Sequence, residues 1–255
     1  GLKGTDEVII PFPEGEYCKE VRIGSAIARA DVIVTMSHFK GHEMTEFGGA
    51  LKNIGMGSAS VGGKLHLHSD SQPVITRENC TGCRQCERNC RHGAVKVAED
   101  HVAVIDYALC VGCGQCIAVC QYDAATSGAP STVRELVAKI SEYALAVLRG
   151  KPHFHISFIT AVSPHCDCWG MNDIPVVPDL GMLASYDPVA LDQACFDLVK
   201  AAPAMAGSVA NPDGTQSRVG EDKFSLVHPR TDGLFGLEHA QKIGVGSRTY
   251  TLIEV

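Results

Sequence analysis

The stretch that decides the fold of this chain is a cysteine run that occurs twice, CTGCRQCERNC over 80–90 and CVGCGQCIAVC over 110–120. Each cysteine of the second run follows its counterpart by 30 residues, as do Gly112 after Gly82 and Ala124 after Ala94. Eight of the twelve cysteines lie in these two runs, which favours metal binding over a disulfide framework. The offset predicts two copies of one supersecondary unit.

The spacing within each run is that of iron–sulfur ligands. A C-x-x-C-x-x-C loop lets three thiolates surround one cluster, and in two-cluster bacterial-type ferredoxins the fourth cysteine of each run binds the opposite cluster. We therefore expect two 4Fe–4S clusters, the first held by Cys80, Cys83, Cys86 and Cys120 and the second by Cys110, Cys113, Cys116 and Cys90. Structural zinc bound by four thiolates is the alternative, although tandem runs are more typical of ferredoxins. Arg91 and Gln121 replace the proline that usually follows the fourth cysteine, which leaves the ligand set intact.

Composition limits the partners of the chain. Its 255 residues are 45% hydrophobic and 20% charged, with a net charge of −7, which argues against binding to nucleic acid or an anionic membrane. No apolar run approaches the roughly 18–20 residues that span a bilayer, and no signal peptide opens the chain. We expect a cytoplasmic protein without membrane insertion, in the reducing cytoplasm of an anaerobe. The opening residue is Gly1, so we also expect that an N-terminal portion is missing.

Outside the cysteine runs, short apolar strands alternate with amphipathic helices. The predicted strands are Ala30–Met36, Phe154–Thr160, Pro175–Val177 and Thr249–Val255, with Ala94–Val97 and His101–Ile105 in the cysteine region. The predicted helices are Ser131–Leu148 with a stop at Gly150, a helix capped by Asp187 with Pro188 at its first position that runs to about Lys200, and Leu234–Ile243 before Gly244. Because Ala30–Met36 is nearly all apolar, we expect it to be covered on both faces.

These patterns predict an α/β protein with an insertion. The larger part is a discontinuous α/β sandwich-type domain made of residues 1–74 and 125–255. A ferredoxin-like α+β domain with two clusters occupies residues 75–124.

Three unusual loops follow candidate strands, at the end where open α/β sheets bind ligands. They span residues 37–57, 163–170 and 178–188. The first supplies His38 and His42 for proton transfer, and Lys40 and Lys52 to hold a small anionic ligand, with Lys64 as a further cation. The alternative is that the histidines cap loops and the lysines are solvated.

The second loop, SPHCDCWG over 163–170, contains paired cysteines. Alternation would put Cys166 and Cys168 on one side, where they could share a soft metal with His165 or form a redox pair. A tetrahedral site would need further ligands, for which the candidates are His38, His42, His66 and His68. The alternative is a loop that packs two inert thiols under Trp169. Elsewhere, Cys195 is predicted to be a buried core thiol, and His66-Leu67-His68 an extended surface segment.

The sequence resembles an uncharacterised iron–sulfur-centre family, domain of unknown function 362, in its ferredoxin-containing subgroup. The matching stretches, besides the cysteine runs, are HFKGHEMTEFGGALKNIGMGSAS, GGKLHLHS, SPHCDC, VPDLGMLASYDPVALDQACFDLV and KIGVGSRTYTLIEV. Family members usually begin well before this chain does, and many carry a cysteine where this chain has Ser58. The resemblance implies an iron–sulfur protein of unassigned reaction. A weaker likeness connects His42, Gly48-Gly49, Lys52 and Gly55 to the nickel-pincer racemases and bears on fold and ligand type only.

Three functions are compatible with these residues. The first is a redox protein, an oxidoreductase of unassigned substrate, whose clusters exchange electrons with a partner protein and with a ligand or additional metal in the α/β domain. The second is a pure electron carrier or hub that docks partner proteins and has no substrate. The third is a sensor or scaffold with structural clusters.

Overall fold

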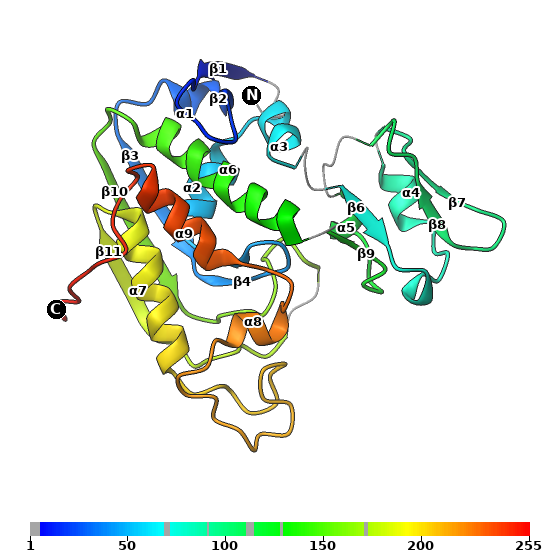
Figure 1. Ribbon diagram of the computed structural model, residues 1–255. Helices are drawn as coiled ribbons and strands as arrows, with labels where there is room; N and C mark the ends of the chain where they lie inside the picture. The colour runs from blue at the N-terminus through cyan, green and yellow to red at the C-terminus, as the bar shows by residue number, and fades with distance from the viewer. Residues whose placement is uncertain (1–5, 69–71, 91, 111–114, 128–129, 171–172) are drawn as a thin grey trace.

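A three-stranded sheet forms the centre of the larger part of the chain. The computed structural model describes residues 6–68, 72–90, 92–110, 115–127, 130–170 and 173–255 (Figure 1). The strands are β3 (Ile33–His38), β10 (His153–Ile159) and β11 (Gly181–Ser185), in the order β11-β10-β3. β10 runs parallel to β3 and antiparallel to β11. This arrangement agrees with the predicted α/β class.

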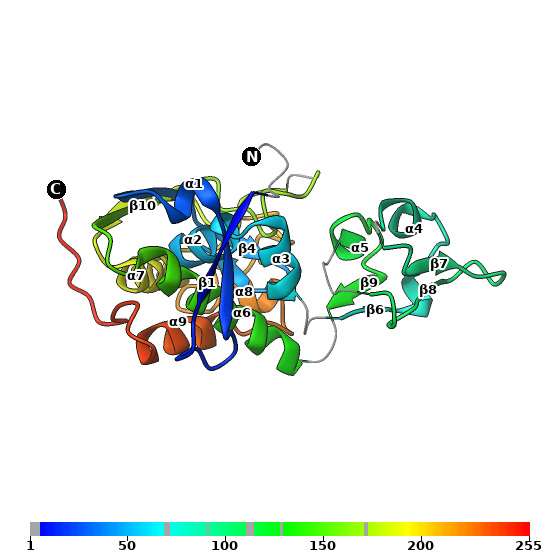
Figure 2. The same ribbon diagram turned by 90° about the horizontal axis from the view of Figure 1, so that it is seen from above.

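Helices cover one face of this sheet in two layers (Figure 2). The inner layer is α2 (Ala50–Ser58) and α7 (Pro188–Ala201); the outer layer is α6 (Pro130–Leu148) and α9 (Gly233–Lys242). The long helices begin and end near their predicted residues, and Asp187 caps α7 by accepting bonds from the amides of Val189 and Ala190. Cys195 is fully buried, as predicted.

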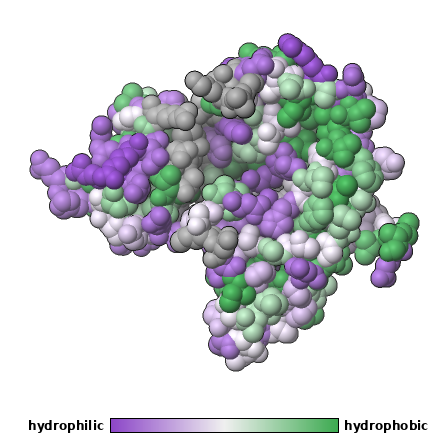
Figure 3. Space-filling view, turned by 180° about the vertical axis from the view of Figure 1, so that it is seen from behind, coloured by the Kyte–Doolittle hydropathy of each residue, from purple (hydrophilic) through white to green (hydrophobic). Residues whose placement is uncertain are grey.

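The other face of the sheet is open within the described residues. Val34 and Met36 of β3 are 63% and 64% exposed, and Met182 of β11 is 62% exposed. Figure 3 shows the molecule from behind, with a broad apolar area on its right. The prediction that Ala30–Met36 is covered on both faces is therefore wrong for the described part of the chain, because the helices pack on one side only.

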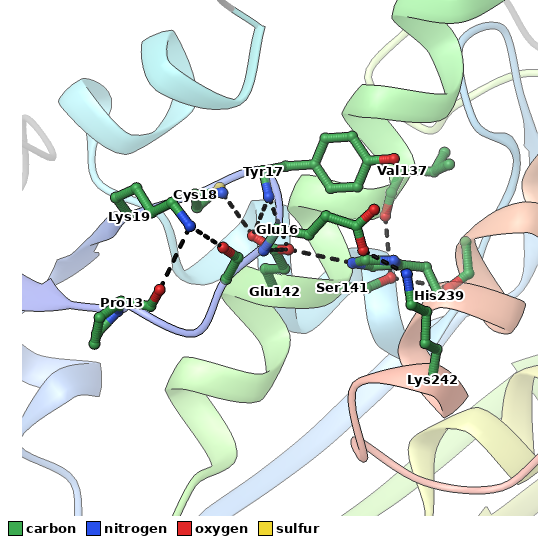
Figure 4. A network of polar contacts seen from close by, with 12 residues as sticks. Pro13, Glu16, Tyr17, Cys18, Lys19, Val137, Ser141, Glu142, His239 and Lys242 are labelled. Carbon is green, nitrogen blue, oxygen red and sulfur yellow. Dashed lines mark hydrogen bonds and ion pairs between the residues drawn. The ribbon is translucent and has the colours of Figure 1, made fainter.

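An N-terminal hairpin packs against α6. It consists of β1 (Glu7–Pro11) and β2 (Glu20–Gly24), followed by α1 (Ser25–Ala28). The loop between its strands is held by the buried carboxylate of Glu142, which accepts hydrogen bonds from three consecutive backbone amides of residues 16–18 and contacts His239 (Figure 4). Two distant segments are thereby joined by one side chain.

Residues 73–127 form a unit with internal two-fold repetition. Its elements are β6 (Pro73–Ile75), η1 (Arg77–Asn79), α4 (Gln85–Asn89), β7 (Val95–Val97), β8 (Ala103–Ile105), α5 (Gln115–Ala118) and β9 (Ala125–Ser127). β8, α5 and β9 begin 30 residues after β6, α4 and β7, so the repeat in sequence is a repeat in structure. β6 pairs with β9 and β7 with β8, and each pair takes one strand from each half. The predicted strands at 94–97 and 101–105 are confirmed as β7 and β8.

Other predictions of secondary structure were wrong. Pro175–Val177 forms no strand, because the flanking Pro175 and Pro178 lack amide donors and only Val176 pairs, with Val162. The third strand is instead β11, within the segment predicted to be a loop. Thr249–Val255 has strand propensity but pairs with no strand of the described residues.

The glycine-rich region also differs from the expected loop. It forms β4 (Lys40–His42), β5 (Glu46–Gly48) and then α2, whose first amides are capped by Asp192 from α7. His66 and His68 lie in a helix, α3 (Val61–His68), rather than in an extended segment, because Ser60 caps its start. A last short helix is α8 (Lys223–Val227). None of the described helices is both long and apolar enough to cross a membrane.

Candidate functional site

Two of the three predicted loops meet because β3 and β10 are parallel and end at the same edge. The amide of Gly41 donates to the carbonyl of Ser163 at 2.8 Å. A Cβ at position 41 would lie 2.1 Å from the carbonyl oxygen of Pro164, so only glycine permits this approach. The two ends of the third predicted loop lie at opposite edges of the sheet, because β11 between them is antiparallel to β10. Asp179 lies at the same edge as the other two loops, where it accepts a hydrogen bond from the amide of Ala161, whereas Ser185–Pro188 lie at the opposite edge.

His38 is held between two acceptors. Its Nδ1 lies 2.9 Å and 3.0 Å from the carboxylate oxygens of Asp167, and its Nε2 lies 2.8 Å from the carbonyl oxygen of Thr160. A carboxylate and a carbonyl oxygen both accept hydrogen bonds, so each suits a ring nitrogen of His38 that carries a proton.

Asp167 also pairs with Lys40, whose Nζ lies 3.3 Å from Oδ2. Burial alone would raise the pKa of Asp167, but the hydrogen bond from His38 and the charge of Lys40 outweigh it and lower the pKa. Sequence reasoning missed Asp167 as a site residue, although it stands between the two cysteines of the SPHCDCWG stretch.

His42 is buried and neutral. Its Nδ1 accepts hydrogen bonds from the amides of Met44 and Thr45, and its Nε2 lies 3.6 Å from Oε1 of Glu43. Burial and the nearby Lys52 hold the pKa of His42 well below its usual range. The proton of the neutral ring is therefore on Nε2, the side that faces Glu43. Glu43 is a second residue that sequence reasoning missed.

Lys52 brings a positive charge into the site from α2. A Cβ at Gly48 would lie 3.1 Å from Cδ of Lys52 and 3.6 Å from Nζ of Lys40, so both lysine side chains pass closely over this glycine. Burial lowers the pKa of Lys52, while the negative charges of Cys166 and Glu43 oppose that effect. The predicted grouping of Lys40 and Lys52 is therefore present, and its charge suits an anion.

Cys166 and Cys168 lie in one turn, in which the amide of Trp169 donates to the carbonyl of Cys166 at 3.0 Å. The neighbouring Cys168 thiol and the charge of Lys52 lower the pKa of Cys166 to about 6, and the same pairing raises the pKa of Cys168. Cys168 is exposed and Cys166 is half-buried. Cys166 lines an open pocket of about 740 Å³ with His38, His165 and Asp167.

His165 is turned toward aromatic rings. It stacks on Trp169 with ring centroids 5.1 Å apart and meets His228 edge-on at 5.2 Å; His228 in turn lies 2.7 Å from the carbonyl oxygen of Pro164. The described residues include no group of three or more His, Cys, Asp or Glu side chains arranged to hold a metal ion. The third metal site at Cys166, Cys168 and His165 stays a prediction.

Several polar atoms around this site are buried without a hydrogen-bond partner among the described residues. They are Oε2 of Glu43, Nδ1 of His68, Nδ1 of His165 and Nε1 of Trp169. Buried polar groups are normally satisfied by protein, water or ligand. The atoms of His165 and Trp169 flank the two cysteines in sequence, and a bound ligand or water would satisfy such groups.

A second group of cysteines lines a small pocket in the 73–127 unit. The cysteines are Cys80, Cys83, Cys86 and Cys120. The amide of Ala103 lies 3.4 Å from the sulfur of Cys80, and that of Ala125 lies 3.4 Å from the sulfur of Cys120. Of the other predicted set, Cys113 lies outside the described residues, Cys90 and Cys110 are half-buried and Cys116 is buried.

Burial lowers the pKa of His228, and the hydrogen bond to the carbonyl of Pro164 and the negative charges of Glu43 and Asp123 partly oppose that shift. Asp123 follows Cys120 by three residues, and His228 contacts His165 next to Cys166.

Comparison with known proteins assigns a family. No curated protein sequence matches this chain. The family model described as Domain of unknown function (DUF362) matches residues 1–197, which include His38, Lys40, His42, Lys52, both cysteine runs and the Cys166–Cys168 pair. The chain therefore belongs to the DUF362 family.

Proposed function

We propose that this chain is an iron–sulfur redox protein whose two 4Fe–4S clusters transfer single electrons to or from the strand-end site of the α/β domain. The observation that carries the proposal is the cavity lined by Cys80, Cys83, Cys86 and Cys120. Three of these cysteines come from one repeat and the fourth from the other, the exchange expected when two halves share their ligands.

The residues around this cavity suit a cluster by their chemistry as well as by the number of cysteines. Two backbone amides lie close to its sulfur atoms, and such contacts stabilise thiolate charge and tune the reduction potential. The remaining lining includes Ile75, Val97 and Tyr122, which limits access of water. A cluster bound there would supply one-electron transfer. By the two-fold repetition, Cys110, Cys113, Cys116 and Cys90 would hold the second cluster.

The strand-end site provides groups that such a redox reaction needs. Lys40 and Lys52 would hold negative charge on a small ligand, and His38, hydrogen-bonded to Asp167 and Thr160, would transfer protons. His42 stays neutral, with its Nε2 3.6 Å from Oε1 of Glu43.

An electron carrier without a substrate is the second candidate. The exposed apolar face over Val34, Met36 and Met182 favours it, since an uncovered patch of this kind is typical of a protein-docking surface. It does not account for the buried lysine and the paired thiols at the strand ends.

Metal analysis of anaerobically purified protein tests the proposal. We expect about eight iron and eight sulfide per chain, and about four of each in Cys83→Ser. Cys195→Ala is the matched control, because this buried cysteine lies outside both runs and its loss leaves the iron content unchanged. Two zinc ions per chain, or an iron content that Cys83→Ser does not alter, would refute the proposal.

A further inference from the structure

Cys166 and Cys168 stand in one turn of the described structure, closed by the hydrogen bond from the amide of Trp169 to the carbonyl of Cys166. The side chain of Cys168 is exposed, and that of Cys166 lines the open pocket. Cys18 and Cys195, which also lie outside the cysteine runs, are completely buried. A thiol pair that is both adjacent and accessible can form and break a disulfide without unfolding of its surroundings.

We propose that Cys166 and Cys168 are a dithiol–disulfide couple, the two-electron redox centre of the strand-end site. The inference rests on the proposed function for the source of its electrons. It goes further in naming the reacting atoms, which are the two sulfur atoms of this turn.

The electron balance suits two one-electron carriers. On reduction the bond between the two sulfur atoms breaks, two electrons and two protons are taken up, and two S–H bonds form. The electrons come one at a time from low-potential iron–sulfur centres, of which two are needed for each disulfide. In the reverse direction two S–H bonds break, the S–S bond forms, and two electrons and two protons leave.

The charges around Cys166 favour this chemistry over metal binding. Lys52 lies close enough to stabilise the thiolate, and Lys40 shares the space above Gly48. Two ammonium groups repel a metal cation but stabilise an attacking or leaving thiolate.

A disulfide between Cys166 and Cys168 would close a short ring, which also favours a redox role for this pair. Cysteines two positions apart close a small loop, and departures from relaxed disulfide geometry make the bond easier to reduce. Reducible disulfides are the exchanging ones, whereas structural disulfides resist reduction. The buried ring nitrogens of Trp169 and His165, which have no hydrogen-bond partner among the described residues, belong to or adjoin this turn.

Redox titration with mass spectrometry tests the couple. Anaerobic holoprotein is equilibrated with mixtures of reduced and oxidised dithiothreitol, quenched in acid, alkylated and digested. We expect the peptide containing both cysteines to lose about 2 Da and its two alkylation sites on oxidation, and its disulfide-to-dithiol ratio to change tenfold for each tenfold change in the buffer ratio. Cys168→Ser abolishes both changes, and Cys195→Ala retains them.

A second arm separates this inference from the proposed function. Reduced methyl viologen, a one-electron donor, is added to protein with the disulfide formed, and we expect its reduction of the disulfide to be at least tenfold slower in Cys83→Ser. An unchanged peptide mass at every buffer ratio, or alkylation blocked by bound metal, would overturn the inference while the iron content still supports the proposed function. A disulfide that titrates in protein without iron–sulfur clusters would leave the couple standing and refute the proposed function.

Discussion

Substitution of Glu142 by glutamine tests how the N-terminal hairpin is attached to α6 (Figure 4). The carboxylate is completely buried and accepts hydrogen bonds from the amides of Glu16, Tyr17 and Cys18 at 2.7, 3.0 and 2.7 Å. Nε2 of His239 lies 3.3 Å from the same group. Glutamine has the same shape, but one of its two terminal atoms is a donor and cannot accept from these amides.

The expected cost follows from the amides left unsatisfied. If the amide nitrogen replaces Oε2, the amide of Cys18 loses its acceptor; if it replaces Oε1, that of Glu16 does, while the amide of Tyr17 keeps a bond of 3.3 Å to Oε2. Each buried donor without a partner costs about 1–3 kcal/mol, and the remaining bonds lose their charge assistance. We expect Glu142→Gln to reduce the free energy of unfolding by about 2–4 kcal/mol and Tm by about 5–15 °C.

The difference in the free energy of unfolding between the parent and Glu142→Gln depends on pH. Burial would raise the pKa of Glu142, but the hydrogen bonds from His239 and the three amides outweigh it and lower the pKa below 4.5. The stabilisation is therefore fully present above pH 4.5 and is lost as the pH falls through the folded-state pKa. The difference in the free energy of unfolding between the parent and Glu142→Gln should therefore narrow as the pH falls through the folded-state pKa of Glu142.

Thermal and urea unfolding followed by helical circular dichroism measure the effect. Glu16→Gln is the control, because it removes only a solvent-exposed ion pair with Lys242 and should cost less than about 1 kcal/mol. A Glu142→Gln variant within about 1 kcal/mol of the parent would show that the loop amides do not depend on this carboxylate.

Two further predictions concern residues that shape the site. Burial raises the pKa of Asp192 to about 7 from 3.8, so its contribution to stability is full below pH 3.8 and is lost as the pH rises to about 7. Urea titrations should show the unfolding free energy of the parent falling over this range by up to about 1.4 kcal/mol per pH unit. The profile of Asp192→Asn should be flatter, and equal slopes in the two proteins would contradict this prediction. Gly41→Ala places a Cβ 2.1 Å from the carbonyl oxygen of Pro164 and should cost about 1–3 kcal/mol in thermal unfolding, whereas Gly170→Ala, with nothing within 4 Å, should change stability by less than about 0.5 kcal/mol. Equal effects of the two alanines would argue against close packing of β4 on the 163–164 segment.

The features that sequence predicted well are those set by residues a few positions apart. The helix at 188–201 was predicted from Asp187 and Pro188, and the structure shows Asp187 accepting from the two amides next to it. The repeat at 80–120 was predicted from spacing, and its strands and helices recur at the same 30-residue offset. A cap or a cysteine loop is specified locally, so it can be read without knowledge of the rest of the fold.

Strand propensity gave wrong predictions where a strand depends on pairing with a segment distant in the sequence. Thr249–Val255 and Pro175–Val177 are apolar and β-branched, but no ladder forms on either within the described residues. Leu183, by contrast, lies on β11 because Ser157 of β10 is opposite it. A strand is stabilised by its neighbour, which its own sequence does not identify.

The sequence by itself determined the cysteine repeat, the main helices and the α/β class, because spacing, caps and periodicity act over one or two turns of chain. Only the tertiary structure decided which groups meet. Asp167 reaches His38 across 129 positions, and Asp192 caps α2 across 142. It also placed Lys52 where its positive charge lowers the pKa of Cys166. Such contacts follow from the parallel pairing of β3 and β10 and the packing of α2 and α7, and no local pattern encodes them.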